Sequence, residues 1–246
     1  MGERIPAVRL VKTGFKEFDS VLVGGFPRPG IVYIIGHPGV GKTTFALQYL
    51  ISRAREGEKG LYITTSEHVN SLLYRFTAFS FYSELKKLMD QGYISFIDFL
   101  PVYGQSPDSV RRLIQMVYSS IPENKINNIV LDSIAGLSQY LTLEDVRTML
   151  SDLVEKTYQS DVTLIIIDEL PLFAEVPHVA VGEFLSDVLI LMDYVRLRET
   201  GRIHTRFLVI KSRISHALRE YYAVEVTPEE GFRFVGPLSG SIEKLI

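Results

Sequence analysis

The stretch that decides the fold is Gly36-His37-Pro38-Gly39-Val40-Gly41-Lys42-Thr43. It fits the pattern GxxxxGK(S/T) at every fixed position, and it lies between a predicted strand at 32–35 and a predicted helix at 42–55. Glycines suit such a loop because the backbone wraps around phosphate oxygens, which requires positive φ and leaves no room for side chains. Backbone N–H groups and the start of the next helix then offer partial positive charge to the phosphates. The pattern therefore predicts a nucleotide-binding phosphate loop.

Each part of this loop has an expected role. We expect Lys42 to reach the β and γ phosphates, and the hydroxyl of Thr43 to ligate Mg²⁺. The alternative, a glycine turn followed by a solvent-exposed lysine, is much less favoured because both the strand and the helix are present. The predicted nucleotide-binding residues are Gly36, His37, Pro38, Gly39, Val40, Gly41, Lys42, Thr43 and Thr44.

Outward from the loop, short β-branched or aromatic runs alternate with longer helical stretches, which predicts a mainly parallel sheet flanked by helices. The predicted strands are 32–35, 60–65, 94–99, 128–132 and 162–168, and the predicted helices are 42–55, 69–89, 109–120 and 143–158. Extended segments then follow at 188–198, 205–211, 221–226 and 232–235. We expect antiparallel strands at this C-terminal edge and one α/β domain over residues 1–246.

Composition narrows the class of protein. The 246 residues are 46% hydrophobic and 22% charged, as in an ordinary globular protein, and the net charge of -3 neither proposes nor excludes a nucleic-acid partner. The absence of cysteine excludes disulfides, thiolate zinc sites and cysteine nucleophiles. No apolar run approaches the roughly 20 residues that span a bilayer, so we expect a cytoplasmic protein without a membrane partner.

A phosphate loop of this type needs a carboxylate at the end of a neighbouring strand to hold Mg²⁺. Asp132 ends the predicted strand 128–132, and the expected strand order makes it the preferred metal-side residue. Asp168 is the rival, because Glu169 follows it in a pattern common among ATPases, and the pair could share the catalytic role. Either aspartate could instead cap the next helix.

Hydrolysis also requires a group that polarises the attacking water. Glu67 follows the strand that comes after the phosphate-loop helix, where its carboxylate could face the γ-phosphate. The alternative is an exposed glutamate at the start of a helix. Glu67 and Lys42 are therefore the candidate catalytic residues.

Several further motifs point to one family. They are TGFKEFD at 13–19, GGFPRPG at 24–30, TFALQ at 44–48, TSEH at 65–68, GEFLSD at 182–187 and KSRISH at 211–216. Together with the phosphate loop they resemble the KaiC-like ATPases of the RecA/RadA superfamily over nearly the whole chain. The resemblance implies a RecA-like P-loop fold that hydrolyses ATP with Mg²⁺. KaiC domains usually carry two adjacent glutamates where this chain has Ser66 and Glu67, which could alter turnover.

The resemblance also implies self-association. Family members usually form hexamer-like rings or filaments, with ATP between subunits and a finger that reaches the neighbour's γ-phosphate. The matching residues here are Lys211, Arg213, Ser215 and His216, with the Ser-His pair one residue earlier than in the family. An arginine supplied in trans is worth ~10³ to 10⁵ in rate because it stabilises transition-state charge. An ordinary polar strand end is the alternative.

Two uses of this ATPase remain open from the sequence. One assists DNA recombination or repair by binding single-stranded DNA. Its support is a basic cluster of Arg196, Arg198, Arg202, His204 and Arg206, which a subunit interface would explain at least as well. The loop 171–182 weakens this hypothesis, because it holds no lysine or arginine for phosphate contacts.

The other use is an ATP-dependent assembly or signalling switch that docks a protein partner, with slow or incidental hydrolysis. The apolar segment 171–181 would then be a contact surface or a packed lid. Because one copy of the motifs is present, we do not expect the autokinase activity of two-domain KaiC. A small-molecule kinase is less favoured because no acceptor-binding insertion is visible.

Overall fold

The computed structural model describes residues 8–22, 24–99, 106–138, 141–170, 182–198, 200–213, 220–238 and 242–244. Its strands are β1 (Arg9–Val11), β2 (Phe26–Arg28), β3 (Gly30–Gly36), β4 (Lys59–Thr64), β5 (Ile94–Asp98), β6 (Ile126–Asp132), β7 (Thr163–Glu169), β8 (Val188–Leu197), β9 (Ile203–Ser212), β10 (Tyr222–Thr227), β11 (Gly231–Pro237) and β12 (Ile242–Lys244). Its helices are α1 (Lys16–Val21), α2 (Lys42–Arg55), α3 (Val69–Phe76), α4 (Tyr82–Asp90), α5 (Pro107–Asn124), α6 (Ile134–Ser138), α7 (Leu143–Gln159) and α8 (Gly182–Leu185).

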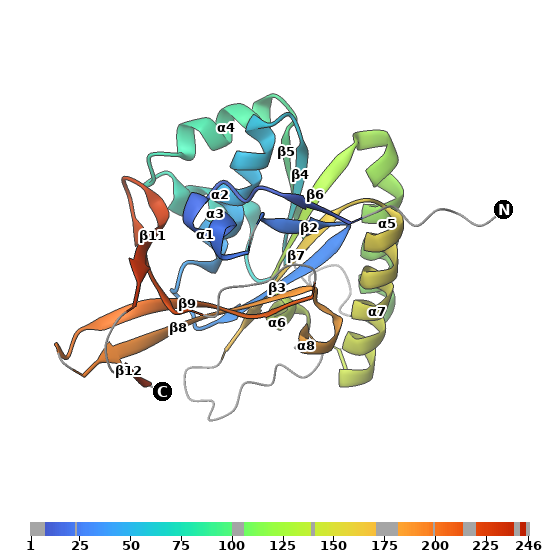
Figure 1. The fold of residues 1–246 in the computed structure, drawn as a ribbon. Coiled ribbons are helices and arrows are strands. Elements are labelled where there is room, and N and C mark those ends of the chain that lie inside the picture. The colour runs from blue at the N-terminus through green and yellow to red at the C-terminus, as the bar shows by residue number, and fades with distance from the viewer. Residues whose placement is uncertain are drawn as a thin grey trace.

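A twisted central sheet separates two layers of helices (Figure 1). Its strand order is β11-β10-β9-β8-β3-β7-β6-β4-β5, and β12 pairs with β8. From β8 to β5 neighbouring strands are parallel, whereas β9, β10 and β11 continue the sheet antiparallel. The predicted α/β fold, with antiparallel strands at the C-terminal edge, is confirmed. The first late strand, β8, differs in detail because it runs parallel to β3.

The phosphate-loop strand β3 lies in the middle of the sheet, and all seven of its residues are buried. Alternate side chains serve two cores, as a strand covered on both faces requires. Val32 and Ile34 pack in the cluster that contains Phe45 of α2, while Tyr33 and Ile35 pack in the cluster beneath α5 and α7. The sequence of β3 is apolar on both faces because both faces are buried.

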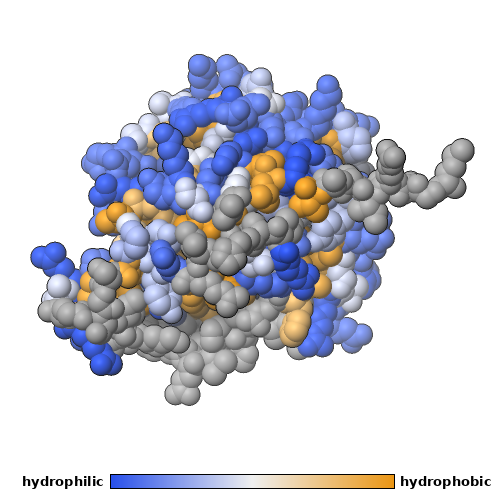
Figure 2. Space-filling model, viewed as in Figure 1, coloured by the Kyte–Doolittle hydropathy of each residue, from blue (hydrophilic) through white to orange (hydrophobic). Residues whose placement is uncertain are grey.

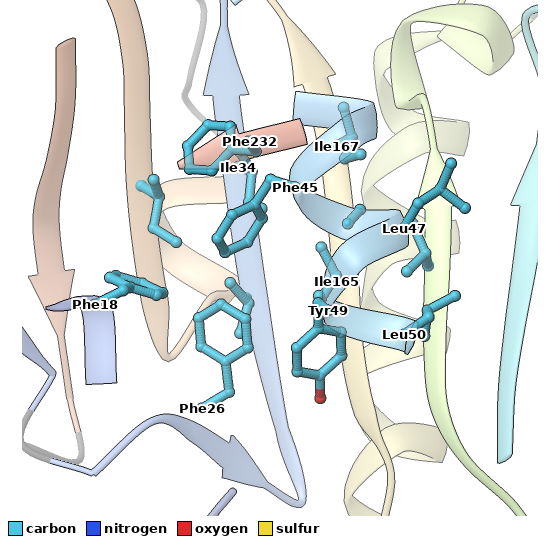
Figure 3. Packing of buried hydrophobic residues seen from close by; sticks show 14 of the residues in the cluster. Phe18, Phe26, Ile34, Phe45, Leu47, Tyr49, Leu50, Ile165, Ile167 and Phe232 are labelled. Atoms are coloured by element: carbon cyan, nitrogen blue, oxygen red, sulfur yellow. The ribbon is translucent and has the colours of Figure 1, made fainter. Parts of the chain in front are cut away.

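Aromatic side chains join both ends of the chain to α2. Phe45 of α2 stacks on Phe15 at 4.9 Å between ring centroids and meets Phe232 of β11 edge-on at 5.2 Å. Phe18 of α1 contacts Phe207 of β9 at 4.8 Å. Figure 3 shows Phe18, Phe45 and Phe232 converging on the β3 side of α2. The N-terminal motif and the C-terminal hairpin are thus parts of the core that supports the phosphate loop.

The predicted helix over 69–89 is wrong, because the structure has two helices, α3 and α4, with residues 77–81 between them. Phe76, Phe79 and Phe81 pack against one another there, with centroids 5.2 to 5.8 Å apart. Ser80 N donates to Pro228 O at 2.8 Å, so the break docks onto the β10–β11 turn. Tertiary packing therefore overrides the helical pattern.

Hydrophilic residues cover the outer surface over α4 (Figure 2).

The other predicted elements match observed ones within a few residues. β1, β2, β12, α1, α6 and α8 were not predicted. The segment 171–181 lies outside the described residues, so the loop prediction stays untested. Across the part of the chain that the structure describes, no helix combines the length and apolarity needed to cross a bilayer.

Candidate nucleotide site

The phosphate loop joins β3 to α2 with the conformation that its glycines permit. Gly39 and Gly41 have φ of 82° and 97°, in the region where residues with a Cβ are strained. A Cβ added to Gly41 would also lie 2.6 Å from Cγ2 of Val226. Gly41 is the N-cap of α2, whose first turn therefore faces the space above the loop. This arrangement can offer backbone N–H groups to an anion.

Lys42 lies inside the loop. Its Nζ donates to Gly36 O at 2.7 Å and to His37 O at 2.9 Å. Burial lowers the pKa of Lys42, and the nearby carboxylates of Glu169, Asp132 and Asp168 oppose this shift. The ammonium is therefore held beside the loop by carbonyl groups that a phosphate could replace.

Thr43 and Asp132 meet although 89 positions separate them in the sequence. Thr43 Oγ1 donates to Asp132 Oδ2 at 2.7 Å, and the hydroxyl of buried Tyr62 donates to the same oxygen. Burial raises the pKa of Asp132, while hydrogen bonds from Tyr62 and Thr43 oppose this rise. A hydroxyl and a carboxylate are hard oxygen ligands of the kind that Mg²⁺ prefers. The two predicted metal-side residues thus lie together.

The strand that carries Asp132 is not adjacent to β3, since β7 lies between them. The adjacent strand β7 carries the rival, Asp168, whose carboxylate accepts from Tyr33 OH at 2.5 Å and from Glu169 N at 2.8 Å. Burial raises the pKa of Asp168, and the Tyr33 hydrogen bond opposes this. Glu169, rather than Asp168, lines the cleft beside the phosphate loop.

A cleft of about 440 Å³ opens above the loop. Its lining is Pro38, Gly39, Gly41, Lys42, Thr43, Thr44, Arg75, Phe76, Phe79, Asp132, Glu169 and Val226. Phe76, Phe79 and Val226 give it an apolar side, suited to a flat nucleobase. Sequence reasoning missed these three and Arg75, because no local motif marks a residue that reaches the cleft from a distant helix or hairpin.

The β10–β11 hairpin is tied to α2 by one side chain. Gln48 Nε2 donates to Glu230 O at 2.9 Å, and Phe232 N donates to Gln48 Oε1 at 2.6 Å. This double contact places Val226 against the cleft. Gln48 belongs to the TFALQ segment that supports the family resemblance, but the sequence does not show that its side chain contacts the β10–β11 hairpin.

Glu67 follows β4 and is ion-paired with Arg75 of α3. Arg75 Nη1 donates to Glu67 Oε2 at 2.5 Å, and Nη2 donates to Oε1. Arg75 lines the cleft, whereas Glu67 does not belong to the lining described above. The role of Glu67 as the catalytic base therefore stays a prediction.

The predicted finger residues lie away from their own phosphate loop. Arg213 N donates to Asp187 O at 2.8 Å, and Asp187 N donates to Ile31 O, so Arg213 is level with the start of β3. Gly36 is five residues farther along, or roughly 16 Å at the rise of a β-strand. The Arg213 guanidinium donates instead to Phe184 O at 2.6 Å. Lys211 lies next to the last residue of β9, while Ser215 and His216 lie outside the described residues.

The predicted basic cluster is smaller than the sequence indicates. Arg206 is buried, and its Nε donates to Asp193 Oδ1 at 2.6 Å. Its guanidinium carbon also lies 4.5 Å from the centre of the Tyr221 ring. Arg196, Arg198 and Arg202 are exposed on the β8–β9 hairpin, with His204 half-buried.

Comparisons with known proteins agree with a nucleotide site at the phosphate loop. The family described as "ATPase: KaiC" matches residues 11–238. UPF0273 protein PF1931 of Pyrococcus furiosus is 28% identical over 141 residues, covering 53% of this chain and 56% of the relative. The circadian clock oscillator protein KaiC of Prochlorococcus marinus is 28% identical over 206 residues, covering 79% of this chain and 39% of the relative. The chain thus spans about half the length of the curated relatives it matches.

A solved structure extends the likeness to the fold. The KaiC-like protein PH0186 of Pyrococcus horikoshii superposes with a TM-score of 0.78 at 27% identity, covering 93% of this chain and 99% of that one. The family match, the shared RecA-like fold and the phosphate loop together confirm the resemblance found in the sequence. The chain therefore belongs to the KaiC family of P-loop ATPases.

Proposed function

We propose that this chain binds ATP with Mg²⁺ in the cleft above the phosphate loop and hydrolyses it, and that its nucleotide state controls assembly with further copies and docking of a protein partner. The contact between Thr43 and Asp132, at 2.7 Å beside Lys42, carries the proposal. It joins two metal-side groups to the phosphate loop, the combination that P-loop nucleotide hydrolysis needs.

Different residues of the cleft bind the phosphates, Mg²⁺ and the base of the nucleotide. The loop N–H groups and the first turn of α2 hold the phosphates, and Lys42 exchanges two carbonyl oxygens for phosphate oxygens. Thr43 and Asp132 hold Mg²⁺, which neutralises phosphate charge when bound. Phe76, Phe79 and Val226 provide an apolar side for the base.

Glu67 is the proposed general base. A carboxylate can accept a proton from the attacking water when it comes within hydrogen-bond distance of that water. Its present partner is Arg75, so hydrolysis requires Glu67 to leave or reorient within this ion pair. Hydrolysis is therefore slow for as long as Glu67 stays in this ion pair.

Self-association is part of the proposal because Arg213 lies level with the start of β3, roughly 16 Å from its own loop. A cation at that place lies too far from its own phosphate loop to act there, so the proposed finger serves the site of a neighbouring copy. Lys211, Ser215 and His216 belong to the same proposed finger.

The switch is favoured over a DNA-linked role by the ion pair of Arg206 with Asp193. This pair removes one arginine from the predicted basic cluster. The exposed Arg196, Arg198 and Arg202 leave single-stranded DNA as the alternative partner.

The test is Mg²⁺-dependent ATP binding and turnover over a protein concentration series, with and without single-stranded DNA. Lys42→Ala should abolish tight ATP binding, and turnover per wild-type subunit should rise with concentration and ignore DNA. Equal ATP affinity in wild type and Lys42→Ala would refute the site. Strong stimulation by DNA would instead support the recombination or repair role.

A further inference from the structure

An ion pair stands at the edge of the cleft and has no part in the phosphate-loop motif. Arg75 donates to both carboxylate oxygens of Glu67, and the two side chains are 59% and 24% exposed. Arg75 belongs to the cleft lining together with Lys42, Thr43 and Asp132. It is thus a cation that faces the nucleotide space of its own subunit.

The helix α3 fixes this position. Leu72 and Phe76 are its buried residues, and they anchor it against the core. Arg75 lies in its last turn next to Phe76, so its side chain leaves the helix toward the cleft while Phe76 forms the adjoining apolar side. Asp132 acts on Arg75 electrostatically, in addition to its partner Glu67. Arg75 is therefore within electrostatic reach of both the metal-side carboxylate and the candidate base.

The ion pair is open to exchange on the Arg75 side. Arg75 is 59% exposed and Glu67 24%, so water reaches the guanidinium and screens part of the attraction between the two charges. A triphosphate carries several negative charges, and guanidinium groups bind phosphate oxygens in the same bidentate geometry that they use for carboxylates. A phosphate in the cleft would therefore compete well with Glu67 for Arg75.

We propose that Arg75 is a second cation of the nucleotide site, held by Glu67 before ATP binds and transferred to the γ-phosphate when ATP binds. The transfer frees the Glu67 carboxylate at the moment when the phosphate to be attacked arrives. The Glu67 carboxylate is thereby free to act as the base only while a triphosphate occupies the cleft. This inference rests on the proposed ATPase function and adds a contact supplied by the same subunit.

The experiment measures equilibrium binding of Mg·ATP and Mg·ADP by calorimetry, with Glu67→Gln protein as the background. That background should slow turnover, and it removes the charge of Glu67, so an effect of Arg75 on binding cannot act through that charge. We expect Arg75→Ala in this background to weaken ATP binding by roughly 10-fold or more, the loss typical of a charge-assisted hydrogen bond. ADP binding should weaken much less, and Arg75→Lys should recover part of the ATP affinity.

Arg55→Ala is the matched control. Arg55 forms an equally exposed ion pair with Glu84, between α2 and α4, and it does not line the cleft. It should leave both nucleotide affinities unchanged, and thermal melting of the nucleotide-free proteins checks that each variant folds.

Unchanged ATP affinity on Arg75→Ala, or an equal loss for ATP and ADP, would overturn the inference. Lys42→Ala in the same background separates this failure from failure of the proposed function. If Lys42 matters and Arg75 does not, the ATP site stands and only the transfer is wrong. If neither matters, the site itself is wrong.

Discussion

Glu58→Gln should destabilise the protein strongly at neutral pH although Glu58 is far from the cleft. Glu58 accepts hydrogen bonds from Arg28 at 2.7 Å, from Arg53 at 2.7 and 3.0 Å, and from Asn128 at 3.0 Å. Arg28 is fully buried and stands in the GGFPRPG segment directly before β3. The glutamine leaves this buried guanidinium without its counter-charge, which is costly.

The magnitude follows from the pKa of Glu58. Burial alone would raise this pKa, but the hydrogen bonds from Arg53, Arg28 and Asn128 outweigh burial and hold it at about 2, below the ordinary 4.5. A depressed carboxyl pKa contributes stability above the unfolded-state value and loses it as the pH falls toward the folded-state value. At about 1.36 kcal/mol per pKa unit, the contribution is about 3 kcal/mol at pH 7 and about 1 kcal/mol at pH 3.

Urea unfolding of wild type and Glu58→Gln at several pH values between 7 and 3 measures this contribution. The difference in unfolding free energy should be about 3 kcal/mol at pH 7 and should shrink toward acid. Glu84→Gln, which breaks the exposed pair with Arg55, should cost less than about 1 kcal/mol. A difference for Glu58→Gln that is small, or constant over this range, would refute the reasoning.

Two further predictions concern the catalytic groups. Glu67→Gln should retain ATP binding and slow single-turnover hydrolysis by ~10² or more, and mixing it with Arg213→Ala protein should restore some steady-state turnover if the finger acts in trans. Unchanged hydrolysis would move the base elsewhere, and no recovery at any mixing ratio would place the whole site in one chain. Asp132→Asn should raise the Mg²⁺ concentration needed for half-maximal turnover, because the metal-side carboxylate loses its charge. A Mg²⁺ titration that matches wild type would instead favour Glu169.

The phosphate loop and the sheet could be predicted from the sequence because their signals are local. A glycine loop between an apolar strand and a helix needs no distant partner to be recognised, and β3 is apolar on both faces because it is buried on both. The helix over 69–89 failed for the opposite reason. Its break near Phe79 is stabilised by contacts with the β10–β11 turn, about 150 positions away in the chain.

The candidate site was predicted in the same uneven way. Lys42 and Thr43 follow from the loop motif, but the pairing of Glu67 with Arg75 depends on the direction in which α3 leaves β4. Likewise, the sequence places Arg206 in a cluster of basic residues, but Asp193 on the neighbouring strand pairs with it and neutralises it. The residue types in a sequence show which charged groups are available. The ion pairs in the fold decide which of these groups can bind a ligand.

The antiparallel edge of the sheet connects the cleft to the proposed subunit contact. Val226 of β10 forms part of the cleft, and Gln48 of α2 fixes the turn after that strand. β10 pairs with β9, and β9 ends beside Arg213, so the residues that would sense the base and the residue proposed to serve a neighbour belong to consecutive strands of one hydrogen-bonded layer. The register places Val224 of β10 opposite Thr205 of β9, so a shift of β10 against α2 would have to pass along β9 to reach Arg213. This shared layer is the physical reason to couple nucleotide binding with assembly in the proposed switch.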